Sequence, residues 1–150
     1  MEDFKRLLDN INKLDINDIF NQLWSDNKTQ NFIIELNTEG QPTSQLFKFG
    51  IDSKGVTLGD YSDFTIQLKI EDGQPFDRIT LKDTGDFYET FVVRPLKKGF
   101  SLNANPNKDG DNLFKNFGED IVGLTKDNEI VLAAFIEKDF NDELEKRLFR

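Results

Sequence analysis

The sequence predicts an α+β fold in which a small antiparallel or mixed β-sheet packs against a long C-terminal helix, with N-terminal helices forming an arm. Apolar residues recur at helical spacing through the first 24 residues and again after Thr125. Between these segments, short β-branched and aromatic runs are separated by turn residues, which is typical of strands. A length of 150 residues suits one compact domain. We therefore expect a helical arm over residues 1–40 and the α+β domain over residues 41–150.

Two short helices are predicted between Asp3 and Trp24, because the apolar residues there lie three or four positions apart. The segment from Asp15 to Asn17 indicates a break or cap between them. A further helix is predicted from Gln30 to Thr38, and Gly40-Gln41-Pro42 ends it. The apolar residues of the first two helices are Phe4, Leu7, Leu8, Ile11, Leu14, Ile16, Ile19, Phe20 and Leu23.

The stretch from Thr65 to Ile70 is compatible with two structures. Apolar residues alternate with polar ones there, which favours a half-buried strand. Ser62 or Asp63 could instead cap a helix that runs from Ser62 to Ile70. We take the strand as the first interpretation and keep the helix as its alternative.

A tight turn followed by one helical turn is predicted from Asp83 to Tyr88. The polar triplet Asp83-Thr84-Gly85 can form a turn capped by a side chain. Such a turn would direct Phe87, Tyr88 and Phe91 into the core, so we expect this segment to have a structural role.

A β-hairpin is predicted next. The run Phe91-Val92-Val93 favours a strand, and Lys97-Lys98-Gly99 turns the chain back into a second strand from Phe100 to Asn103. Residues 103–111 are rich in Asn, Asp and Gly and predict a loop.

Two helices are predicted in the last third of the chain. The first runs from about Asn112 to Phe117 and ends at Gly118, where a glycine permits a left-handed conformation. The second starts after the capping residue Thr125, carries acidic residues in its first turn and extends to Phe149. Because phenylalanine is the dominant apolar residue, with 15 copies, we expect a core built mainly from aromatic rings.

Composition argues against several functions. The net charge of −9 and the lack of a basic stripe disfavour sequence-independent nucleic-acid binding. No cysteine or histidine is present, which removes thiolate nucleophiles, most zinc sites and the commonest general base. The longest apolar run, Ile130 to Ile136, is far shorter than the ~20 residues of a membrane span. We expect a chain made and used inside a cell.

Residue spacing suggests two possible sites, and the sequence argues against both. Four carboxylates invite comparison with the paired acids of glycosidases, but acidic residues are so frequent here that such proximity is expected by chance. Residues 105–116 imitate a calcium loop, yet Asn105 and Asn116 stand where Asp and Glu are needed. No glycine-rich phosphate loop is present. We expect no enzyme activity, no metal and no cofactor. The four carboxylates are Asp60, Asp63, Asp83 and Asp86.

An ordered set of motifs carries a family resemblance. It begins with Asp52-Ser53-Lys54-Gly55 and Tyr61-Ser62-Asp63-Phe64-Thr65, continues with Lys69 and residues 79–91, and closes with residues 117–125 before the last helix. Over residues 50–146 this pattern resembles the virion morphogenesis, or tail-completion, proteins of tailed bacteriophages, particularly those of gut Bacteroides-type hosts. The stretch from Gly40 to Ser44 departs from that family. The motif residues with an implied structural role are Asp83, Thr84, Gly85, Phe87, Phe91, Gly118, Gly123 and Leu124.

The resemblance implies a structural component of the head–tail junction, acting in a neck, connector or tail-completion ring. We expect a ring of about six or twelve copies that contacts neighbouring neck, portal or tail proteins. DNA would pass through the lumen without specific binding, and no membrane would be involved. The protein would be made in the host bacterial cytoplasm and reside in the virion. The alternatives are a soluble acidic adaptor or inhibitor of a single host protein and a carboxylate-dependent hydrolase.

Overall fold

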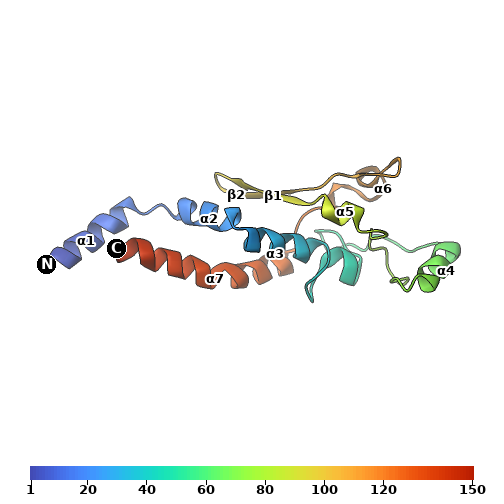
Figure 1. Ribbon diagram of the computed structural model, residues 1–150, viewed down its shortest axis with the longest axis horizontal. Helices are drawn as coiled ribbons and strands as arrows, with labels where there is room; N and C mark the ends of the chain where they lie inside the picture. Colours follow the sequence, from blue (N-terminus) through green and yellow to red (C-terminus); the bar gives the residue numbers. More distant parts are fainter.

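The computed structural model describes residues 1–150 and has an elongated shape (Figure 1). The α+β class is confirmed: helices dominate and a two-stranded antiparallel sheet is the largest sheet. The elements in chain order are α1 (Glu2–Lys13), α2 (Ile16–Ser25), α3 (Asn27–Asn37), a π-helical turn (Gln45–Phe49), α4 (Asp63–Glu71), α5 (Asp86–Glu89), β1 (Val92–Leu96), β2 (Gly99–Asn103), β3 (Asn107–Lys108), β4 (Asp111–Asn112), α6 (Leu113–Phe117), a 3₁₀ turn (Glu119–Ile121) and α7 (Lys126–Leu148).

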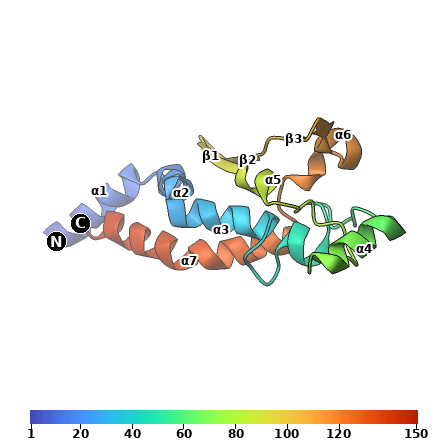
Figure 2. The same ribbon diagram turned by 45° about the vertical axis from the view of Figure 1, so that its right-hand side comes forward.

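Three layers make up the body of the molecule. Helices α1, α2 and α3 run along α7 in the opposite direction, so both chain termini lie at one end (Figures 1 and 2). The β1–β2 hairpin lies on the other side of α2 and α3 from α7. Helix α4 projects at the end opposite the termini. The sheet therefore reaches the long C-terminal helix through a middle layer of two helices.

Side-chain caps explain where the helices begin. Asp15 accepts a hydrogen bond from the backbone N–H of Asn17, which confirms the predicted break between the first two helices. Asp26 caps α3 in the same way, so this helix starts three residues before the predicted Gln30. Thr125 caps α7 through the N–H of Asn128, as its hydroxyl predicted.

The predicted strand at Thr65 to Ile70 is wrong, and the helical alternative is correct. Ser62 accepts the N–H of Thr65 and starts α4. No residue of α4 is buried, so the half-buried face that the alternation of apolar residues predicted is not formed. The predicted loop at residues 103–111 contains the small β3–β4 hairpin. Gly118 ends α6 as predicted, but its φ of 87° and ψ of 161° are not left-handed helical.

Two apolar clusters form the core. The larger cluster joins α2, α3, β1 and α7, and the smaller one joins the π-helical turn, α5 and its flanks, α6 and the 3₁₀ turn. Ile34 and Leu102 pack against both clusters, so the core is continuous. The larger cluster consists of Ile19, Leu23, Trp24, Ile33, Leu36, Val93, Leu132 and Ile136. The smaller cluster consists of Leu46, Phe87, Tyr88, Phe91, Leu113 and Ile121.

The expectation of a core built mainly from phenylalanine is wrong. Of the phenylalanines, only Phe87 and Phe91 are buried, and most of the other buried apolar residues are aliphatic. Many remaining rings lie half-buried between elements, as in the stacked pair Phe32 and Phe135, whose centroids are 3.9 Å apart. Phenylalanine therefore works here mostly at the boundaries between elements and at the surface.

The N-terminal helices differ in how they relate to the core. Helix α1 has no buried residue, whereas α2 and α3 supply five members of the larger cluster. The side chain of Asn10 donates to the backbone carbonyl of Leu148 at 2.9 Å and so ties α1 to the end of α7. Within residues 1–40, only α1 has the exposure expected of an arm.

Candidate functional site

The Thr-Gly corner at residues 83–91 orders the smaller cluster. Gly85 has a φ of +92° and stands immediately before α5. The Thr84 hydroxyl accepts the N–H of Asp86 at 3.4 Å, so Thr84 and not Asp83 makes the side-chain contact in this turn. Phe87 and Phe91 then meet edge to face, with centroids 5.1 Å apart, inside the cluster. Both are packing residues, while Asp83 and Thr84 are exposed.

The second group of motif residues lies in the segment that leads into α7. Gly123 has a φ of +144°, and a Cβ atom at this position would lie 3.1 Å from the Cβ of Ser53. Leu124 packs against the larger cluster. Gly118 is exposed, with no atom close to the position of a Cβ. Ile121, which lies between Gly118 and Gly123, belongs to the same cluster as Phe87. This segment is therefore linked to the Thr-Gly corner.

Three buried amide side chains hold this segment, and sequence reasoning did not find them. Asn37 accepts the N–H of Gly123 at 2.7 Å and donates to the carbonyl of Ile121 at 3.0 Å. Gln45 donates to the carbonyl of Gly123 at 2.8 Å and accepts the N–H of Thr125 at 2.9 Å. Such bonds satisfy backbone groups that burial would otherwise leave without partners.

Asn128 completes this amide cluster, which we define as Asn37, Gln45 and Asn128. Its Nδ2 donates to Gln45 Oε1 and to the backbone carbonyls of Leu36 and Thr43. Its Oδ1 is buried and has no hydrogen-bond partner. Isolated Asn and Gln residues carry no periodic pattern, so no signal in the sequence distinguishes them from surface amides.

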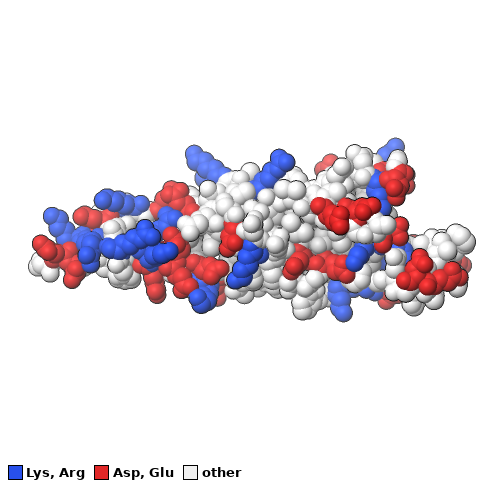
Figure 3. All heavy atoms as spheres, in the orientation of Figure 1, with Lys and Arg blue, Asp and Glu red and all other residues white.

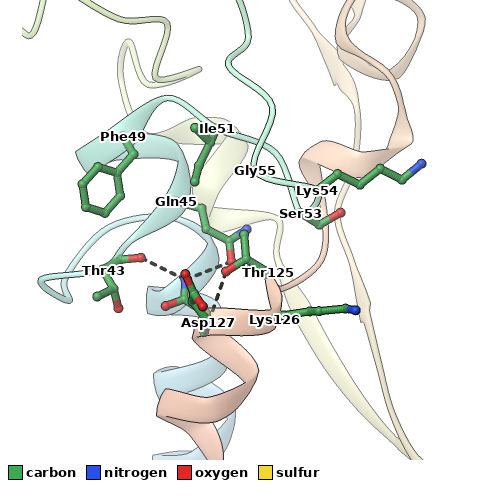
Figure 4. Close-up of a pocket in the computed structure, with 11 residues that line it drawn as sticks. Thr43, Gln45, Phe49, Ile51, Ser53, Lys54, Gly55, Thr125, Lys126 and Asp127 are labelled. Carbon is green, nitrogen blue, oxygen red and sulfur yellow. Dashed lines mark hydrogen bonds between the residues drawn. The ribbon is translucent and has the colours of Figure 1, made fainter.

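An open cleft of about 760 Å³ lies beside the amide cluster (Figure 4). It is bounded by the π-helical turn, by residues 51–55 and by the first turn of α7. Lys54 and Lys126 extend away from Gln45, while Asp127 lies near it (Figure 4). Lys54 forms an ion pair with Asp120 at 3.1 Å. Only Phe49 and Ile51 among the lining residues are apolar, and no nucleophile paired with a base is among them.

The four carboxylates that invite comparison with glycosidases lie at the surface. Asp60, Asp63, Asp83 and Asp86 are all exposed. No group of three or more acidic side chains is arranged to hold a metal ion.

The polar segment that imitates a calcium loop forms a hairpin and a helix cap. Asn105 Oδ1 accepts the N–H of Asn107, and Asn112 Oδ1 caps α6. These oxygen atoms therefore already have partners within the chain.

Three side chains have shifted pKa values with clear causes. Burial raises the pKa of the Tyr88 phenol above its usual range, and the charge of Glu39 adds to the rise. Tyr88 thus stays protonated and donates to the carbonyl of Thr80. A hydrogen bond from Arg147 lowers the pKa of Glu143. A hydrogen bond that Lys138 donates to Asp142 raises the pKa of Lys138. The first shift reflects core packing, and the other two reflect ion pairs along α7.

Exposed apolar side chains gather at both ends of the molecule. At the end where α4 projects, Phe64 is 73% exposed, and Leu68 and Ile70 are also exposed. At the opposite end, Phe4 is 60% exposed, and Leu8 and Ile11 share its side of α1. We call these surfaces the α4 end (Phe64, Leu68 and Ile70) and the α1 end (Phe4, Leu8, Ile11 and the neighbouring Phe149).

Comparisons with protein-family models, with curated proteins and with solved structures find no match. The resemblance to phage tail-completion proteins therefore rests on the sequence motifs alone. No helix of the chain combines the length and apolarity needed to cross a bilayer. The candidate functional sites are accordingly the two apolar ends and the cleft beside the amide cluster.

Proposed function

We propose that this chain is a structural component of a tailed-phage virion, acting at the head–tail junction as a subunit of a neck, connector or tail-completion ring. The observation that supports this proposal is the exposed apolar surface at both ends of a domain that has its own continuous core. Larger exposed apolar patches on a soluble domain typically mark sites of protein association.

A ring needs two different surfaces on each subunit, because a head-to-tail interface joins unlike patches. The α1 end and the α4 end meet this need, since they lie at opposite ends of an elongated molecule. In the proposed ring, about six or twelve copies surround the DNA channel, and other faces contact the portal, neck or tail proteins.

The charge of the chain suits a channel that DNA crosses without binding. With a net charge of −9, the protein repels the phosphate backbone at long range. Specific recognition of DNA has no place in this proposal. DNA is a passing partner only, and the lasting contacts are between proteins.

The direct test deletes the gene in the phage that encodes it and images the particles. The proposal predicts filled heads that lack tails, and restoration of tails when the wild-type gene is supplied. Mass spectrometry of purified particles should detect the chain at about six or twelve copies. Intact particles from the deletion strain, or particles without this chain, would contradict the proposal. A chain that binds a single host protein as a monomer would favour the adaptor alternative.

A further inference from the structure

We infer that the α4 end of one copy binds the α1 end of a second copy of this chain. This inference rests on the proposed function only in assuming that the chain assembles with itself. It goes further by assigning the two surfaces that form the contact. Four features support it: exposure, separation, the position of charges and the absence of a partner for either surface within the fold.

The α4 end has an apolar face with an acidic rim. Phe64 and Leu68 are four residues apart and so lie on one side of α4. Glu71 and Asp72 follow Leu68 by three and four residues and therefore border the same side. Neither of these two acidic residues forms an ion pair within the chain.

Acidic residues dominate the surroundings of α4. Between Gly59 and Asp77 the chain has five acidic residues and a single lysine. That lysine, Lys69, donates to Gln74 and to the carbonyl of Lys82, so hydrogen bonds hold it to the chain beyond α4. The red surface at the α4 end in Figure 3 reflects this excess. A partner surface for α4 therefore needs apolar side chains and accessible cations.

The α1 end offers both. Phe4, Leu8 and Ile11 form an exposed apolar strip, and Lys5 lies three residues before Leu8, at the border of the strip. Lys5 is exposed and has no ion-pair partner within the chain. Arg150 follows the exposed Phe149 at the same end. Figure 3 shows Lys and Arg side chains around this end, interspersed with acidic ones.

Charge also disfavours the pairing of two α4 ends. Two α4 ends in contact would place unpaired carboxylates opposite each other, and such repulsion opposes an interface. Pairing of unlike ends instead sets Glu71 and Asp72 against a surface that carries Lys5 and Arg150. Because the two ends lie far apart on one molecule, each copy can bind two neighbours, which produces a ring or an open chain.

The test uses variants that block one end each. The α4 variant carries Phe64→Asp and Leu68→Asp, and the α1 variant carries Phe4→Asp and Leu8→Asp. All four residues are exposed, so both variants should fold, which circular dichroism and thermal unfolding will verify. Ile130→Asp is the matched control, because Ile130 is 69% exposed on α7 and belongs to neither end.

Sedimentation over a range of concentrations should show self-association of the wild-type chain and of the control. Each blocked variant should associate at least about tenfold more weakly. An equimolar mixture of the two blocked variants should form a 1:1 dimer that grows no further, because one intact α1 end meets one intact α4 end. An α4 variant that still dimerises with itself would indicate pairing of like α1 ends and overturn the inference.

The absence of cysteine allows a second readout. Chains carrying Leu8→Cys and chains carrying Phe64→Cys should form mixed disulfide dimers faster than either forms dimers with itself. Preferential cross-linking of like chains, or a wild-type chain that stays monomeric up to about 1 mM, would contradict the inference. These assays use purified protein alone, so they can fail while the particle experiments succeed, and the reverse also holds.

Discussion

The middle of this molecule and its two ends differ in where polar and apolar side chains lie. In the middle, Asn37 and Gln45 each satisfy buried backbone groups, and apolar side chains fill two connected clusters. At the ends, large apolar side chains such as Phe64 and Phe4 face solvent. If the ends are the surfaces of assembly, as we propose, folding and assembly use separate residues, and substitutions should separate the two properties.

The largest expected effect is on the smaller cluster. Phe87→Ala removes a ring that is 2% exposed and should lower the free energy of unfolding by about 3–5 kcal/mol. Phe64→Ala, made on a ring that is 73% exposed, should change it by less than about 0.5 kcal/mol. Urea unfolding followed by circular dichroism measures both. If both variants lose the same free energy of unfolding, the distinction between the middle and the ends is wrong.

A somewhat smaller effect is expected in the amide cluster. Gln45→Ala leaves the carbonyl of Gly123 and the N–H of Thr125 without their side-chain partner in a buried setting. The free energy of unfolding should fall by about 2–3 kcal/mol. Gln67→Ala on the exposed side of α4 is the matched control and should be nearly neutral. If both variants unfold at the same urea concentration as wild type, the amide cluster does not stabilise the middle.

Gly123 tests the close approach of two segments. Gly123→Ala places a Cβ 3.1 Å from that of Ser53 at a φ of +144°, which should cost about 1–3 kcal/mol. Gly118→Ala also meets a positive φ but has open space around it, so it should cost less. Ser53→Gly should recover part of the loss in the Gly123 variant. The thermal midpoints of the three proteins measure these differences, and a Gly118 variant that is the less stable one would argue against the close contact.

The smallest expected effect concerns pH at the end of α7. The hydrogen bond from Arg147 lowers the pKa of Glu143 below its ordinary value of 4.5 in the folded chain. The stabilisation is therefore complete above pH 4.5 and is lost as the pH falls through the lowered pKa. Glu143→Gln should therefore reduce the loss of stability as the pH falls below 4.5. Glu145→Gln serves as the exposed control, and an unchanged pH profile in the Glu143 variant would show that this ion pair is not coupled to folding.

Local signals predicted the helices and the hairpin well. The caps at Asp15 and Thr125 act through side-chain hydrogen bonds to nearby backbone N–H groups, so they can be identified from a few adjacent residues. The same holds for the Lys97-Lys98-Gly99 turn that joins β1 to β2. Such features need no information about distant parts of the chain.

At Thr65 to Ile70 two local signals favour different structures, because the alternation of apolar residues indicates a strand whereas Ser62 caps a helix. Long-range features, in contrast, could not be predicted from local signals. Asn37 lies 84 positions from Ile121, to whose carbonyl it donates, so sequence alone gave no indication of this bond. The motif at residues 83–91 correctly predicts that Phe87 and Phe91 pack in the core, whereas nothing in the sequence indicates that the other phenylalanine rings are half-buried or exposed.

The proposed separation of a stable middle from two binding ends can be measured by hydrogen–deuterium exchange at low and high protein concentration. Residues 2–13 and 63–71 should exchange more slowly at high concentration, while the amide cluster and the β1–β2 hairpin should keep their rates. Protection that rises instead over the hairpin or the cleft, with α1 and α4 unchanged, would contradict the assignment of the two ends as the surfaces of assembly.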